Sequence, residues 1–201
     1  MTKYKVTFMF NEAVLGTAPL NKELYSEFIA SKAENGEPTD DEIESVPETI
    51  EKGTTGFHRS PSGQPVIYDY VIKGVFKDAA GMLRRVPGTQ SAKLTAYKKV
   101  IDGLIFVSPR QIPVTFAQGQ TEVGILERPL RAQTPQGERV ALARSEMIDA
   151  GASMEFTLNL LDQKLEPLVR EWLEYGELRG LGQWRNGGWG RYSFSMTEVL
   201  P

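Results

Sequence analysis

The connections between the strand-like segments in the second half of the chain constrain the fold most strongly. Short turns separate these segments, and strands that are joined by short turns pair antiparallel, because a parallel crossover needs a dozen or more residues. A β-rich segment is predicted over Gly103–Val114, and further strands over Glu122–Pro129, Glu138–Met147 and Met154–Leu161, with turns at Pro135–Gly137 and Ala150–Gly151. We therefore expect a sheet that is mostly antiparallel.

Helical patterns interrupt the strands. A strand over Lys3–Phe10 opens the chain, and a strand over Arg191–Met196 closes it. One helix follows the Pro-Ser-Gly turn and is expected to group Tyr70, Val71, Val75, Ala79 and Met82. Further helices are expected over Asn21–Lys32, Ala92–Ile101 and Leu165–Tyr175. This order predicts an α+β fold of ferredoxin-like or RNA-recognition type, with helices on one face of an antiparallel sheet.

The composition bounds the domain count and the chemistry. With 201 residues and 40 % hydrophobic content, the chain can bury one core, so a single domain over residues 1–201 is expected. The chain has no cysteine, which excludes disulfides, thiolate nucleophiles and cysteine-ligated zinc. Its single histidine, His58, excludes multi-histidine metal sites. We expect no metal or other cofactor.

The same composition favours a cytoplasmic protein. The absence of cysteine fits a reducing compartment, and the strand-like N-terminus lacks the apolar run of a signal peptide. No segment approaches the eighteen or so apolar residues of a membrane-spanning helix. We expect neither secretion nor a membrane partner.

Acidic residues gather in one segment. Residues 33–55 contain Pro38 and Pro47 and few large apolar side chains. The segment predicts an acidic, mobile insertion with one short helix around Asp40–Ser45. Such a charged insertion is either a solvated loop or a docking site for a basic protein partner.

Basic residues gather directly afterwards, so a chain of formal net charge -3 can still carry a basic face. Lys73, Lys77 and Arg84 fall near a common side of their helix. They are either phosphate-backbone contacts or an ordinary solvated face. The other cations of this region are Arg85, Lys93, Lys98 and Lys99.

A glycine-rich loop near the C-terminus is the strongest candidate site. Its sequence from Gly180 to Tyr192 is G-L-G-Q-W-R-N-G-G-W-G-R-Y. Glycines let backbone amides approach phosphates, arginines supply charge, and a tryptophan can stack on a base. The alternative is a tight structural crossing with both tryptophans in the core. The candidate residues for nucleic-acid binding are Lys73, Lys77, Arg84, Arg179, Trp184, Arg185, Trp189 and Arg191.

A second arginine-rich segment surrounds a polar turn. The turn has the sequence R-A-Q-T-P-Q-G-E-R, and the arginines in and around it are Arg128, Arg131, Arg139 and Arg144. The segment is either a finger that reaches a strand or a neighbouring subunit, or a plain hairpin.

Three segments in order resemble the repeat-associated mysterious protein (RAMP) superfamily of CRISPR effector subunits. P-S-G-Q-P-V-I-Y-D-Y-V-I-K-G-V-F-K-D-A looks like its turn, strand and "IKG" helix, A-G-A-S-M-E-F-T-L-N-L-L is similar to a later strand, and residues 178–192 look like its glycine-rich loop. The resemblance implies a modified ferredoxin-like fold that holds single-stranded RNA through the helix and the loop.

The chain departs from the RAMP pattern at three places. Tyr68, Asp69, Tyr70 and Val71 stand where backbone subunits carry a phosphate-binding Pro-Gly-Ser-Ser, and Lys77 stands where they carry an arginine. Thr54 and Thr55 occupy the neighbourhood where target-cleaving subunits carry an aspartate. The chain also resembles an uncharacterised family of bacteriophages and prophages, through L-R-A-Q-T-P-Q-G-E-R-V-A-L-A and R-G-L-G-Q-W-R-N-G-G-W-G-R. In that setting its location would be the host cytoplasm.

These observations favour a non-catalytic protein that binds single-stranded RNA or DNA, assembled as like subunits along the strand. An alternative is a metal-independent endoribonuclease in which His58, on a loop, acts as general base or acid and Arg59 stabilises the phosphate. Another is a protein-interaction module that uses the acidic insertion.

Overall fold

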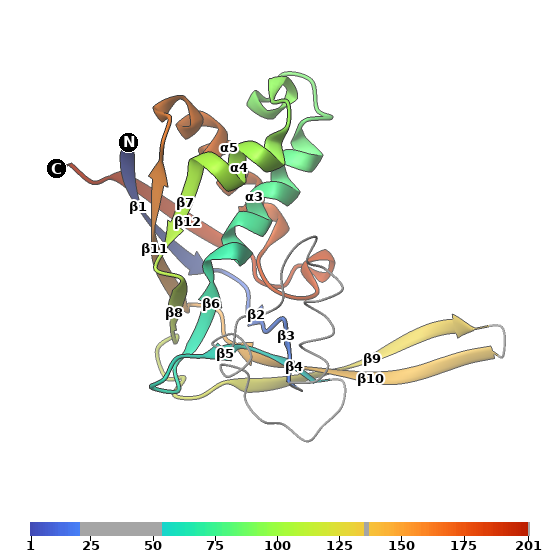
Figure 1. Cartoon of the computed structure of the whole chain (residues 1–201). Coiled ribbons are helices and arrows are strands. Elements are labelled where there is room, and N and C mark those ends of the chain that lie inside the picture. The colour runs from blue at the N-terminus through green and yellow to red at the C-terminus, as the bar shows by residue number, and fades with distance from the viewer. Residues whose placement is uncertain (21–53, 135–136, 201) are drawn as a thin grey trace.

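An antiparallel sheet forms the centre of the molecule (Figure 1). The computed structural model describes residues 1–20, 54–134 and 137–200. The strands of this sheet lie in the order β12-β1-β11-β8-β6-β5, and β7 also pairs with β11. Their bounds are β1 Thr2–Phe10, β5 His58–Arg59, β6 Pro65–Tyr68, β7 Ile105–Ser108, β8 Gln111–Thr115, β11 Ser153–Leu160 and β12 Tyr192–Glu198. The antiparallel pairing that the short turns predict is confirmed.

Strand β1 is the axis of this sheet. It pairs with β11 on one side and β12 on the other, so the N-terminal strand lies between two strands from the end of the chain. Its alternate residues Tyr4, Val6, Phe8 and Phe10 are buried, because side chains alternate between the two faces of a strand. The ring of Phe8 stacks on that of Tyr192 with centroids 3.8 Å apart.

Three helices in the described residues cover one face of the sheet (Figure 1). They are α3 Asp69–Leu83, α4 Tyr97–Leu104 and α5 Glu166–Arg179. Phe76 of α3 and Trp172 of α5 meet in the core with ring centroids 5.8 Å apart. The α+β fold class predicted from the strand and helix patterns is thus confirmed.

The predicted buried face of α3 needs correction. Tyr70 and Met82, expected on the apolar side of α3, are 40 % and 47 % exposed, whereas Ile72 and Phe76 are fully buried. The buried stripe runs through Ile72, Val75, Phe76, Ala79 and Ala80, at the spacing of three and four residues that one helix face requires.

The helix predicted over Ala92–Ile101 is divided. A short 3-10 helix, Gln90–Lys93, is followed by Ala96 with a φ of 49°, and α4 begins only at Tyr97. Trp172 explains the break, because its indole nitrogen donates to the buried hydroxyl of Ser91 at 2.8 Å and holds this segment against α5.

A second, smaller sheet carries a long hairpin. Its strands are β2 Val14–Leu15, β3 Ala18–Pro19, β4 Thr54–Gly56, β9 Gly124–Thr134 and β10 Gly137–Ile148. Strands β9 and β10 extend away from the other labelled strands as a two-stranded ribbon (Figure 1). Strand β9 continues through Pro129, where a strand end was predicted, because among the described strands β9 pairs with β10 alone and an edge strand tolerates proline.

The acidic insertion predicted over residues 33–55 ends earlier than expected. Thr54 and Thr55 belong to β4, and they pair parallel with Arg144 and Ser145 of β10. Thr54 is buried, so this end of the segment is part of the second sheet. The rest of the insertion and the helix predicted over Asn21–Lys32 lie outside the described residues.

The helix predicted to end at Tyr175 continues to Arg179 as α5, and its Gly176 is buried. A Cβ atom at Gly176 would overlap the Tyr192 hydroxyl. We expect Gly176→Ala to destabilise the fold by about 1–3 kcal/mol through overpacking. Gly74→Ala in α3 is the matched control, since a Cβ there meets nothing within 4 Å. It should stabilise the fold by about 0.5–1 kcal/mol.

Urea unfolding followed by circular dichroism measures both variants. Equal free energies of unfolding for the two would contradict this packing of Gly176 against Tyr192.

Candidate nucleic-acid interface

The glycine-rich loop crosses the segment that connects β1 to β2. The Leu181 amide donates to the Gly190 carbonyl at 2.9 Å, and the Gly190 amide donates to Ala13 at 2.8 Å. Gly180 and Gly190 have φ values of 83° and 71°, and a Cβ at either would overlap the backbone of the opposite side of the loop. At these two positions, glycine lets the two sides of the loop lie against each other.

Two tryptophans lie at the tip of the loop and just after it. Trp184 has a φ of 53°, in the left-handed region that bulky residues rarely adopt, and it begins a 3-10 turn, Arg185–Gly187. Trp184 and Trp189 are both half-buried, so neither lies fully in the core. The Arg128 guanidinium of β9 lies over the Trp184 ring, 5.9 Å from its centroid. The loop tip and the base of the hairpin therefore form one surface.

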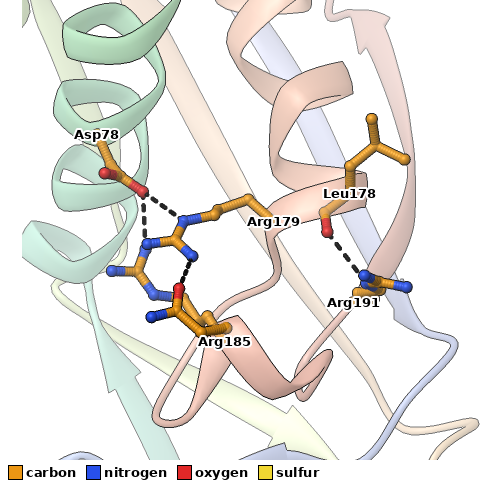
Figure 2. A network of polar contacts seen from close by, with 6 residues as sticks. Asp78, Leu178, Arg179, Arg185 and Arg191 are labelled. Carbon is orange, nitrogen blue, oxygen red and sulfur yellow. Dashed lines mark hydrogen bonds and ion pairs between the residues drawn. The ribbon is translucent and has the colours of Figure 1, made fainter.

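Three arginines of the loop region divide into two environments (Figure 2). Arg179 and Arg185 both contact the Asp78 carboxylate, with nitrogen–oxygen distances of 3.1 and 3.2 Å. Arg191 lies apart and donates from Nε to the Leu178 carbonyl at 3.0 Å. Within the described residues, no acid forms an ion pair with Arg191 or Arg128. Around the loop, in the part of the chain that the structure describes, these two guanidinium groups are the ones without an acid partner.

Lys73 and Lys77 lie on a different side of α3 from Asp78, and they contact α4 and β7. The Lys77 ammonium pairs with Asp102 at 2.7 Å, and the Lys73 ammonium lies 5.1 Å from the Phe106 ring centroid. Arg84 lies over the Tyr97 ring at 5.7 Å. The eight candidate residues thus form two separate groups, three beside α4 and five around the glycine-rich loop. The sequence gives no sign of this division.

His58 is placed in strand β5 and buried, whereas the sequence places it on a loop. Its ring meets the Tyr68 ring edge-on at 4.8 Å. Burial, with the neighbouring Arg59 guanidinium, lowers the pKa of His58 to about 4. Arg59 itself pairs with Glu146 at 2.6 Å. The cavity beside His58 has a volume of about 30 Å³. This is room for about one water molecule, and it is far smaller than the volume of a nucleotide.

Two residues of this surface, Arg128 and Glu12, could not be connected with the loop from the sequence. Arg128 is 56 positions from Trp184 in the chain and meets it only through the fold. Glu12 lines a hollow together with Gly187, Gly188, Trp189 and Arg191. The loop motif alone carries no signal for either residue, because neither is near it in the sequence.

Metal and membrane features are absent from the part of the chain that the structure describes. No cluster of three or more histidine, aspartate or glutamate side chains there could hold a metal ion. No helix in those ranges has the length and apolar character needed to cross a bilayer.

Comparison with known proteins gives a fold likeness. No family model and no curated protein matches the sequence. The structure is similar to one chain of the type III-B Cmr-beta complex bound to cognate target RNA, with a TM-score of 0.59 and 11 % identity. The match covers 98 % of this chain and 60 % of that chain, so our chain spans less than two thirds of its neighbour.

A chain of a type IV-B CRISPR complex matches with a TM-score of 0.46 and 15 % identity, over 97 % of this chain and 90 % of that chain. The Cmr-beta likeness shows a shared fold over nearly the whole of this chain.

The burial of His58 predicts a pH-dependent stability. Its pKa is about 6.5 when unfolded and about 4 when folded, so the unfolded chain binds more protons between these values. Stability is therefore fully present above the unfolded value and falls as the pH drops toward 4. From pH 7 to pH 5, we expect a loss of about 2 kcal/mol from this group.

Urea unfolding of wild type and His58→Gln at both pH values isolates the contribution of His58, because the other titrating groups are common to both chains. An equal pH dependence in both proteins would contradict a buried, neutral His58.

Proposed function

We propose that this chain is a non-catalytic protein that binds single-stranded nucleic acid. The observation that carries the proposal is the surface formed by the loop tip and the hairpin base, where two half-buried tryptophans lie beside two arginines with no acid partner in the described residues. Indole rings stack on bases of any sequence, and guanidinium groups contact phosphates. The left-handed Trp184 supports a functional role, since backbone strain concentrates at binding sites.

The likeness to a subunit of a complex bound to target RNA supports a nucleic-acid ligand. RNA is the ligand that the resemblance favours, and single-stranded DNA is the ligand that a phage replication setting favours. The Asp78 pairing gives Arg179 and Arg185 a positioning role in this proposal, because one carboxylate holds both side chains at the loop. Lys73, Lys77 and Arg84 extend the contact along α3 for a longer strand.

The two alternatives have less support from the described residues. The burial of His58 and its lowered pKa make it a poor general acid or base near neutral pH. RNA that stays intact with wild type in EDTA would remove the nuclease alternative. The interaction module depends on the acidic residues 34–51, which lie outside the described part. Deletion of that segment should abolish partner binding under this alternative and leave strand binding intact under ours.

The salt dependence of binding tests the surface. We expect wild type to bind a labelled strand of about 30 nucleotides, and Arg128→Ala/Arg191→Ala to bind it several-fold more weakly. Each phosphate contact contributes about 0.7 to the slope of log affinity against log salt, so the double variant should lose about 1.4 of this slope. Fluorescence anisotropy from 50 to 200 mM salt, with RNA and DNA, gives both quantities.

The matched control is Lys5→Ala/Lys164→Ala, which also removes two positive charges. Lys5 pairs with Glu155 on β11. Lys164 lies shortly after β11 ends, near the Thr2 end of β1, whereas the loop lies near the opposite end of β1. This control should retain the wild-type slope. Equal slopes for the two double variants, or no binding by wild type, would overturn the proposal.

Assembly along the strand is the further part of the proposed function. We expect the mass of the complex to rise with strand length, with several copies of the chain on 45 nucleotides and fewer on 15. Sedimentation velocity at saturating protein measures this stoichiometry. One copy on both strands would show a monomeric binder.

A further inference from the structure

A hollow of about 220 Å³ lies between the glycine-rich loop and the turn after β1. Its lining comes from Glu12 on one side and from Gly187, Gly188, Trp189 and Arg191 on the other. The amides of Asn11 and Glu12 both donate to the Arg191 carbonyl, at 2.9 and 3.2 Å. These bonds fix the two sides relative to each other, so main-chain hydrogen bonds set the spacing between the walls of the hollow.

The walls of this hollow offer three kinds of contact. Trp189 supplies a half-buried aromatic ring, and the exposed Arg191 guanidinium uses only Nε, toward Leu178. Glu12 supplies an exposed carboxylate, and no cation in the described residues forms an ion pair with it. Gly187 and Gly188 add backbone without side chains, which leaves room beside the ring.

The Glu12 carboxylate determines which kind of ligand the hollow favours. A site for phosphate alone would gain nothing from Glu12, because a carboxylate repels a phosphate. A carboxylate instead selects a ligand edge that presents hydrogen-bond donors, and a pair of adjacent donors makes the strongest, bidentate contact. The volume is below the ~300–1,000 Å³ of pockets for drug-sized ligands, which fits one planar base.

We infer that this hollow binds a guanine base of the bound strand, an inference that rests on the proposed function. Guanine presents N1–H and the N2 amino group side by side, so the Glu12 carboxylate can accept from both. Adenine and cytosine place a ring-nitrogen acceptor beside their amino group, and uracil flanks its single N–H with two carbonyls, so each meets repulsion from the carboxylate. Trp189 stacks on the base, and Arg191 contacts the adjoining phosphate.

The test compares strands that differ at one base. The host is a labelled 15-nucleotide oligouridine, or oligothymidine if wild type prefers DNA, with its central base unchanged or replaced by guanine or by hypoxanthine. Hypoxanthine retains N1–H and lacks the amino group. We expect wild type to bind the guanine strand about tenfold more tightly than the unchanged host, and the hypoxanthine strand with an intermediate affinity.

Glu12→Gln should bring the ratio of the guanine strand to the host close to one, because an amide cannot accept both hydrogen bonds. Glu155→Gln removes the same charge from a surface pair on β11 and should retain the wild-type ratio. Glu12 is exposed and only its backbone is hydrogen-bonded, so this variant should fold as wild type does. Trp189→Phe keeps a stacking ring, and it should preserve the guanine preference that Trp189→Ala weakens.

The outcomes separate the two proposals. If wild type binds none of the strands, the proposed function fails. If wild type binds all three with equal affinity, or Glu12→Gln keeps the guanine preference, the inference about the hollow is overturned while strand binding stands. A guanine preference that Glu12→Gln removes and Glu155→Gln retains establishes it.

Discussion

The crossing between the glycine-rich loop and the β1–β2 connection is the constraint on which the candidate site depends. Backbone hydrogen bonds join Gly190 to Ala13 and the Gln183 amide to the Leu15 carbonyl, at 2.8 and 3.3 Å. At Gly182 the loop backbone lies so close to the Leu15 carbonyl that no side chain fits, and at Gly180 and Gly190 the two sides of the loop itself approach as closely. Because main-chain bonds hold the crossing, it does not use the side chains of Trp184, Trp189 and Arg191. Trp184 lies at the tip of the loop, and Trp189 and Arg191 lie between the tip and β12.

Electrostatics then divides the basic residues by role. Asp78 holds Arg179 and Arg185 together, so much of their charge is balanced within the fold. Arg128 and Arg191 have no such acid in the described residues, and they flank the two tryptophans. A strand that follows this surface would meet stacking rings and unbalanced cations together, and these are the two contributions that single-strand binding uses.

Much of the architecture was predictable because the relevant signals are local. The alternation in β1 and the turns between later strands specified an antiparallel sheet. Errors arose where a distant residue decided the outcome. Trp172 binds Ser91 and fixes the segment that interrupts the predicted helix, and β10 recruits Thr54 into a sheet. The burial of His58 also depends on packing, since the sequence around it looks like a loop.

The sequence by itself determined the fold class and named the glycine-rich loop as the candidate site, because strand alternation, short turns and glycine clusters are properties of neighbouring residues. Only the tertiary structure decided which residues share that site. It brought Arg128 to Trp184 and Glu12 to Trp189, and it placed Lys73 and Lys77 on a different side of α3 from Asp78. The physical reason is that these contacts join positions far apart in the chain, which only the strand pairing and the loop crossing bring together.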